Sequence, residues 1–121
     1  MAGERVLLVD DNELNLDLAQ YVLEADGFVV DRALHVDEAW ARLRAYRPDI
    51  ALVDIQLPGS DGLSLVRAIK ATPGLADIPV IAFTAYAMQG DEQRFLAAGC
   101  DGYLAKPIDV HSFAAQVRSY L

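Results

Sequence analysis

The sequence predicts an α/β fold in which helices cover both faces of a five-stranded parallel sheet. Two observations support this prediction. Five short apolar runs alternate with five helical patterns along the 121 residues, and such alternation is typical of parallel sheets. Three of the runs are apolar throughout, as expected for strands that are covered on both sides. The length fits one domain, so we expect residues 1–121 to form a single domain.

The expected strands are the apolar runs at 6–9, 28–30, 50–53, 79–83 and 102–104. The first, third and fourth are the continuously apolar ones, which predicts that they lie in the centre of the sheet. Crossovers between parallel strands are right-handed, and this restricts the possible topologies. A flavodoxin-like strand order, 2-1-3-4-5, is therefore favoured, with function expected outside the carboxyl ends of the strands.

Each expected helix follows a strand and ends at a glycine or proline signal or at the end of the sequence. The helical patterns lie within 12–27, 35–49, 62–74, 89–100 and 109–121. In the first, the apolar residues at helical spacing are Leu14, Leu18, Tyr21, Val22 and Ala25, followed by Gly27 as a stop. In the last, one apolar stripe is formed by Val110, Phe113, Ala114, Val117 and Leu121.

Composition excludes several classes of protein. The net charge of −8 argues against independent binding to nucleic acid, for which basic patches supply most of the affinity. No apolar run approaches the roughly 18 residues of a membrane span, and the N-terminus does not resemble a secretory signal. We therefore expect a cytoplasmic protein. Cys100 is the only cysteine, which rules out an intrachain disulfide and a multi-thiolate zinc site.

Polar residues stand where the expected strands end. Asp10 and Asp11 follow the first strand, Asp54 the third and Thr84 the fourth, and Lys106 comes soon after the fifth. Taken singly, each has an ordinary explanation as a helix cap, a turn residue, a strand threonine or a surface lysine. The carboxyl ends of parallel strands share one edge of the sheet, however. We therefore expect all five side chains to converge there.

The chemistry of such a site follows from its charges. Two carboxylates about 4 Å apart repel each other by roughly 4 kcal/mol at an effective dielectric constant near 20, so three of them need a cation. Oxygen ligands without thiolate or imidazole favour Mg²⁺, which often recruits a phosphate oxygen as well. Lys106 and Thr84 suit further phosphate oxygens. Asp54, on a central strand with a turn after it, is the best candidate for a nucleophile toward phosphorus.

Four segments carry a resemblance to a known family. They read "VLLVDDNELN", "PDIALVDIQLPGSDGL", "IPVIAFTAYA" and "GCDGYLAKPI". In order and spacing they resemble the receiver domain of two-component response regulators, over essentially the whole chain. The details are most similar to DivK-like single-domain regulators and to receivers attached to hybrid kinases. The resemblance implies a CheY-like fold of the flavodoxin type.

The resemblance also implies the roles of the acidic residues. Asp54 would accept a phosphoryl group from a phosphohistidine on a histidine kinase or a histidine phosphotransfer protein. Asp11 would bind Mg²⁺ directly, and Asp10 would bind it directly or through water. The backbone carbonyl of Gln56 would complete the ligands supplied by the protein.

Further residues would bind the phosphoryl group and change conformation on phosphorylation. Lys106 would pair with the phosphoryl oxygens, and its peptide bond to Pro107 is expected to be cis. Thr84 and Tyr103 match the switch pair of the family: the hydroxyl of Thr84 would move toward the phosphate and the ring of Tyr103 would fill the vacated space.

The resemblance implies protein partners on two surfaces. The fourth helix, fifth strand and fifth helix would contact a downstream target through residues that include Tyr86, Met88, Phe95, Tyr103 and Phe113. The first helix, with Asn15, would contact the kinase. We expect a monomer or weak dimer from a bacterial phosphorelay. The chain would be a phosphoacceptor switch that takes part in its own phosphorylation and slow dephosphorylation, and not a turnover enzyme.

Two other classes of protein share parts of this pattern. A phosphohydrolase of the haloacid-dehalogenase type also uses aspartate, Mg²⁺, threonine and lysine, but it would place a second acid two residues after the nucleophile on the first strand, where this chain has Asn12. A nucleotide- or flavin-binding domain would need a glycine- or serine-rich phosphate loop after the first strand. The segment "DDNELN" would instead repel phosphate in the absence of a metal.

Overall fold

A five-stranded parallel sheet forms the centre of the molecule. The structure, a computed structural model, describes residues 3–57, 60–85 and 91–121. The sheet contains β1 (Arg5–Val9), β2 (Val29–Ala33), β3 (Ile50–Asp54), β6 (Val80–Thr84) and β7 (Gly102–Ala105). Its order is β2-β1-β3-β6-β7, and every neighbouring pair is parallel. This is the predicted flavodoxin-like order.

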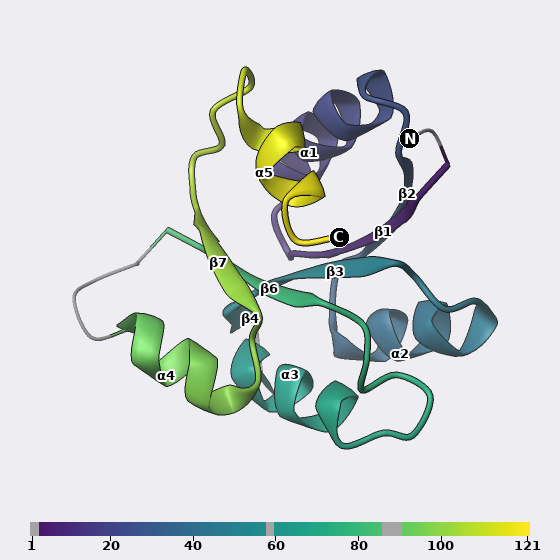
Figure 1. Cartoon of the computed structure of the whole chain (residues 1–121), viewed down its shortest axis with the longest axis vertical. Helices are drawn as coiled ribbons and strands as arrows, with labels where there is room; N and C mark the ends of the chain where they lie inside the picture. The colour runs from purple at the N-terminus through teal and green to yellow at the C-terminus, as the bar shows by residue number, and fades with distance from the viewer. Residues whose placement is uncertain (1–2, 58–59, 86–90) are drawn as a thin grey trace.

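Helices cover both faces of the sheet, as Figure 1 shows. The described helices are α1 (Glu13–Ala25), α2 (Val36–Ala45), α3 (Gly62–Lys70), α4 (Asp91–Ala98) and α5 (Phe113–Arg118). Buried residues of α1 and α5 form one apolar core with the sheet, and those of α2, α3 and α4 form a second core on the opposite face. The sequence did not predict the small antiparallel hairpin of β4 (Gln56–Leu57) and β5 (Ser60–Asp61) that follows β3.

Burial separates the central strands from the edge. All residues of β3 and β6 are buried, as their continuous apolar sequences predict. The second strand extends beyond the apolar run that predicted it, because its pairing with β1 continues through Asp31 and Arg32 to Ala33. Polar side chains are tolerated in this edge strand because their charges are paired: Asp31 lies 3.3 Å from Arg5, and Arg32 lies 2.7 Å from Asp17.

Most of the apolar stripe predicted for the first helix does not face the core, and only Val22 of that stripe packs partly against it. Leu14 is 79% exposed and Tyr21 is 74% exposed. The buried residues of α1 are Leu16, Ala19 and Leu23. Helix α1 therefore carries two apolar stripes, and both satisfy helical spacing. The stripe with the small Ala19 between two leucines packs against the sheet and α5. Leu14, Leu18 and Tyr21 of the other stripe face solvent.

The last helix is shorter than its apolar pattern. Regular α-helix covers only Phe113–Arg118, and a turn precedes it. Phe113 and Val117 are buried, whereas Val110 and Leu121, at the two ends of the predicted stripe, remain about half exposed. None of the helices in the described ranges has the length and apolar character that a bilayer crossing requires.

Candidate phosphoacceptor and metal site

Strand register brings two carboxylates together. Strands β1 and β3 are neighbours, and Val9 pairs with Val53. The residues that follow these two, Asp10 just after β1 and Asp54 at the end of β3, therefore lie at the same level. Both are almost fully buried, at 1% and 5% exposure. The local sequence produces this arrangement because the apolar runs 6–9 and 50–53 are each followed directly by an aspartate.

The three predicted acids form one cluster. One carboxylate oxygen from each of Asp10, Asp11 and Asp54 lies within 4.8 Å of the others. Oxygen ligands on opposite sides of an octahedral Mg²⁺ stand about 4.2 Å apart, since each lies about 2.1 Å from the ion. The spacing of the acids is thus close to what Mg²⁺ requires, and their hard oxygen donors match its preference.

Lys106 lies between two of the acids. Its Nζ is 2.7 Å from Oδ2 of Asp10 and 3.2 Å from Oδ2 of Asp54. The Lys106–Pro107 peptide bond is cis, and the Lys106 amide donates a 2.8 Å hydrogen bond to the carbonyl of Thr84. The ammonium also stands 5.1 Å from the centre of the Phe83 ring. The lysine thus supplies positive charge to two buried carboxylates at once.

The partners of the two Asp10 carboxylate oxygens and the charge of the cluster favour a bound cation. Oδ1 of Asp10 accepts a 2.9 Å hydrogen bond from the Asn12 amide. Oδ2 of Asp10 is buried, and the Lys106 ammonium 2.7 Å away is its counter-charge. The three carboxylates of the cluster carry more negative charge than the single ammonium of Lys106 offsets, and a cation would offset the rest. The residues present therefore fit a divalent metal.

Asp54 differs from an ordinary surface acid. Burial raises the pKa of its carboxyl, while the Gln56 amide and Lys106 act in the opposite direction and Asp10 raises the pKa further. The Gln56 amide donates a 2.9 Å hydrogen bond to Oδ1 of Asp54, which leaves Oδ2 directed toward Lys106. One oxygen is therefore held by the turn after β3, and the other faces the charged cluster.

The predicted switch residues lie on one face of the sheet. Tyr103 of β7 pairs with Ala82 of β6, and Thr84 is two residues beyond Ala82, so its side chain points to the same face. Thr84 is buried, and Tyr103 is partly buried, with its ring centre 6.1 Å from that of Phe95 in α4.

Other candidates are placed less closely to the acids or lie outside the described residues. Phe113 packs in the core beneath Phe83, with ring centres 5.9 Å apart, so its ring is not available to a partner. Asn15 is partly exposed on α1. Tyr86 and Met88 lie outside the described residues. Asn12 is the N-cap of α1 and accepts a 3.1 Å hydrogen bond from the Asn15 amide.

Two features of this site were not predicted from the sequence. Lys106 was expected to pair with a phosphoryl group only, whereas the structure also places its Nζ 2.7 Å from Asp10. A helix was expected from residue 62, but not the close contact of Gly62 with the backbone of Asp54. The pattern "GSDG", in which Asp61 caps α3 through the Leu63 amide, is the signal that a helix begins this close to the strand end.

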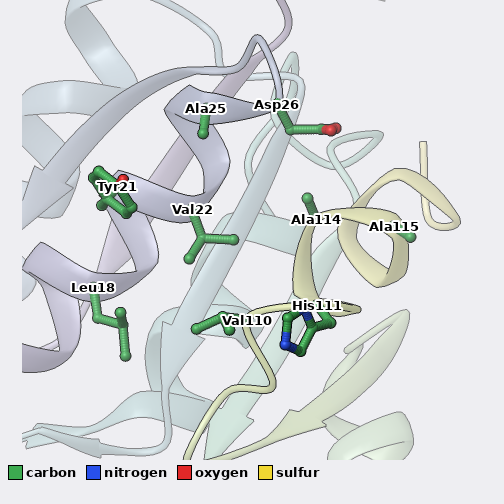
Figure 2. A pocket seen from close by; sticks show the side chains of 9 residues that line it. All are labelled: Leu18, Tyr21, Val22, Ala25, Asp26, Val110, His111, Ala114 and Ala115. Carbon is green, nitrogen blue, oxygen red and sulfur yellow. The ribbon is translucent and has the colours of Figure 1, made fainter.

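A groove between α1 and α5 opens on another surface. Its volume is about 460 Å³, and Figure 2 shows Leu18 and Val22 on one wall and Val110 and Ala114 on the other. Its lining residues are Leu18, Tyr21, Val22, Ala25, Asp26, Val110, His111, Ala114 and Ala115. The solvent-facing stripe of α1 thus continues into this groove.

Comparison with known proteins agrees with the geometry. A family profile described as the response regulator receiver domain matches residues 6–118. The polar-differentiation response regulator DivK of Brucella anthropi is 45% identical over 116 residues, which cover 96% of this chain and 94% of that protein.

Solved structures extend the comparison. The receiver domain of the sensor histidine kinase PA1611 from Pseudomonas aeruginosa, solved with a magnesium ion in its active-site cleft, is 34% identical, with a TM-score of 0.87 and 98% of both chains covered. The chemotaxis response regulator CheY4 of Vibrio cholerae has a TM-score of 0.92 at 24% identity, covers 99% of this chain and 100% of its own, and shows the shared fold. Together, these matches and the strand-end site show that the chain belongs to the response regulator receiver domains of two-component phosphorelays.

Proposed function

We propose that Asp54 accepts a phosphoryl group from a phosphohistidine on a histidine kinase or histidine phosphotransfer protein. The observation that carries this proposal is the placement of Asp54 in a cluster with a second buried acid, Asp10, and with Lys106, whose Nζ lies 3.2 Å from Oδ2 of Asp54. Asp10 shares the strand end, the burial and the contact with Lys106. We assign the nucleophile to Asp54 because the resemblance to receiver domains implies this role for it.

The transfer is a substitution at phosphorus. An oxygen of the Asp54 carboxylate attacks the phosphorus atom, the bond between phosphorus and the imidazole nitrogen breaks, and its electron pair stays on the imidazole. The product is an acyl phosphate on Asp54. Lys106, already at the cluster, then pairs with a phosphoryl oxygen, and the Thr84 hydroxyl donates to another.

Four groups would hold the metal. The carboxylates of Asp10, Asp11 and Asp54 would bind Mg²⁺ together with the backbone carbonyl of Gln56, as the donor set and its spacing favour. When bound, Mg²⁺ supplies positive charge that offsets the repulsion between the acids and the phosphoryl oxygens. The magnesium ion in the cleft of the PA1611 receiver supports this assignment by similarity.

Thr84 and Tyr103 change position on phosphorylation. Because both side chains lie on the same face of the sheet, a shift of Thr84 toward the phosphate changes the space next to the Tyr103 ring. That ring packs on Phe95, so the change reaches α4. The face made of α4, β7 and α5 would therefore contact a downstream protein. We propose a monomer or weak dimer in the cytoplasm, with residues 1–121 acting as one receiver domain and without turnover of a free substrate.

The solvent-facing stripe of α1 suits the phosphate donor. Leu14 and Leu18 are exposed, and α1 begins at Glu13, directly after the acidic cluster. Exposed apolar residues of this kind mark protein contacts. A donor that packs on this stripe would have its phosphohistidine close to Asp54, which is why we assign the kinase or phosphotransfer protein to α1.

Labelling of matched aspartate variants tests the proposal. Wild type, Asp54→Asn and Asp37→Asn are incubated with Mg²⁺ and acetyl phosphate, and the added phosphate is measured by intact-protein mass spectrometry; a parallel set uses beryllofluoride and fluorine NMR. Asp37 is an exposed acid in the first turn of α2, so it controls for loss of one negative charge. We expect labelling of wild type and Asp37→Asn and none of Asp54→Asn. Equal labelling of the two variants would contradict the proposal.

A further inference from the structure

Gly62 packs against the backbone of the proposed phosphoacceptor. It is the first residue of α3 and is buried. A Cβ atom added at this position would lie 2.7 Å from Cα of Ile55, 3.0 Å from the carbonyl carbon of Asp54, and closer still to the Asp54 carbonyl oxygen. The backbone of Gly62 does not have a positive φ. Glycine is therefore required here by lack of space, and not by backbone conformation.

The backbone touched by Gly62 is the turn that orients the site. The Gly62 amide donates a 3.0 Å hydrogen bond to the carbonyl of Ile55. The same peptide group, between Ile55 and Gln56, is also held through its amide, which donates a hydrogen bond to Oδ1 of Asp54. Gln56 pairs with Asp61 across the β4–β5 hairpin. The Asp54–Gln56 turn is thus held between its own carboxylate and the start of α3.

We propose that Gly62 is a positioning residue for the metal and phosphoryl site: the missing side chain lets α3 hold the Asp54–Gln56 turn in the position that Mg²⁺ binding requires. The inference rests on the proposed function, because the turn supplies two of the expected ligands.

The required precision shows why one methyl group matters. Non-bonded carbon atoms approach to about 3.5–4.0 Å, so the added Cβ must move away from the Ile55 Cα by roughly 1 Å. Metal ligands keep their distances within about 0.2 Å. A shift of this size in the turn therefore exceeds what the site tolerates. The contacting atoms belong to the backbone, so no side chain can rotate to relieve the overlap.

Two glycine-to-alanine variants separate positioning from general destabilisation. Gly62→Ala should bind Mg²⁺ at least tenfold more weakly in calorimetric titration and react more slowly with acetyl phosphate. The control is Gly74→Ala. Gly74 has a φ of +86°, and no atom lies within 4 Å of where a Cβ would stand, so alanine there strains the backbone and lowers stability without touching the site. It should retain the wild-type Mg²⁺ affinity even where its melting temperature falls as far as that of Gly62→Ala.

A measurement on the wild type covers the case in which Gly62→Ala fails to fold. The Gly62 amide is bonded to the Ile55 carbonyl, so its hydrogen exchange should slow when Mg²⁺ is added. The Gly99 amide, bonded to the Leu96 carbonyl away from the acids, should change much less.

The outcomes distinguish this inference from the proposed function. A wild type that neither binds Mg²⁺ nor becomes labelled on Asp54 would overturn both. A wild type that does both, with unchanged Mg²⁺ affinity in a folded Gly62→Ala, would overturn the positioning role alone. Unchanged exchange of the Gly62 amide on saturation with Mg²⁺ would also overturn it.

Discussion

Replacing Lys106 with methionine should make the stability of this receiver depend strongly on Mg²⁺. The lysine is the described cation closest to the acids: its Nζ lies 2.7 Å from Asp10 and 3.2 Å from Asp54. Its side chain is only 12% exposed. Methionine retains most of the volume of the lysine stem but removes the charge. Without metal, the variant is therefore left with two buried carboxylates and no counter-charge.

The distances set the scale of the effect. At an effective dielectric constant near 20, the two contacts correspond to about 6 and about 5 kcal/mol of attraction. Burial of the ammonium offsets much of this, and breaking a buried ion pair by removing one partner typically costs about 3–5 kcal/mol. We expect a loss of that size in EDTA. In saturating Mg²⁺ the metal supplies the missing charge, so the loss should shrink by about 2 kcal/mol, equivalent to roughly thirtyfold tighter Mg²⁺ binding by the variant.

Urea unfolding followed by tryptophan fluorescence measures both quantities. Trp40 is the only tryptophan and lies on α2, so it reports unfolding without being part of the site. Wild type and Lys106→Met are unfolded in EDTA and in saturating Mg²⁺, and the four unfolding free energies form a thermodynamic cycle. The difference between the two losses should equal the change in Mg²⁺ binding free energy obtained by direct titration.

A second lysine provides the control. Lys70 lies 2.9 Å from Asp101 and donates to the carbonyl of Ile78 at 2.7 Å, at a distance from the acidic cluster. Lys70→Met should lose the same stability in EDTA as in Mg²⁺. If Lys106→Met behaves in the same way, with a loss that Mg²⁺ does not reduce, Lys106 is not the counter-charge that the metal replaces and our reasoning is wrong.

Two further predictions concern the core. Burial, assisted by the Asp101 carboxylate, raises the pKa of the Cys100 thiol from 9.0 to about 11. Because only the unfolded chain then ionises its thiol, the free energy of unfolding should fall as pH rises from about 9 to about 11. In urea titrations Cys100→Ala should lack the part of this fall that comes from the thiol. An identical pH slope in wild type and variant would contradict the prediction. Leu16→Ala should lower the free energy of unfolding by about 2–5 kcal/mol, whereas Leu14→Ala on the exposed stripe should change it by less than about 0.5 kcal/mol. Thermal and urea unfolding measure both effects. If α1 packed through the predicted stripe, Leu14→Ala would be the more destabilising variant.

The sequence was sufficient to predict that three acids and a lysine meet at one edge of the sheet. Strand ends can be read from where apolar runs stop, and parallel strands bring those ends to one edge. Asp10 and Asp54 meet because each directly follows a buried apolar run, 6–9 or 50–53, and the register of Val9 with Val53 places them at the same level. Alternation and handedness restricted the strand order to a few possibilities, and the favoured one is the order observed.

Periodicity could not choose between the two stripes of α1. Spacing shows that a residue shares a helix face with its neighbours, but not which face meets the sheet. Leu14 and Leu16 have the same residue type, yet one is 79% exposed and the other is buried. Only the packing of α1 against the sheet and α5 decides between them, and that packing depends on residues far away in the sequence.

The contacts of Lys106 and Gly62 could not be predicted for a different reason. Both depend on the exact positions of atoms in different segments of the chain, and a sequence pattern does not give these positions. A strand-end lysine was expected to pair with a phosphoryl group, whereas the structure places its ammonium against Asp10 as well as Asp54. A metal held by the carboxylate of Asp10 would compete with this ion pair. Mg²⁺ would then have a second consequence besides charge neutralisation, because the ammonium released from Asp10 would pair with the phosphoryl group that we propose Asp54 accepts.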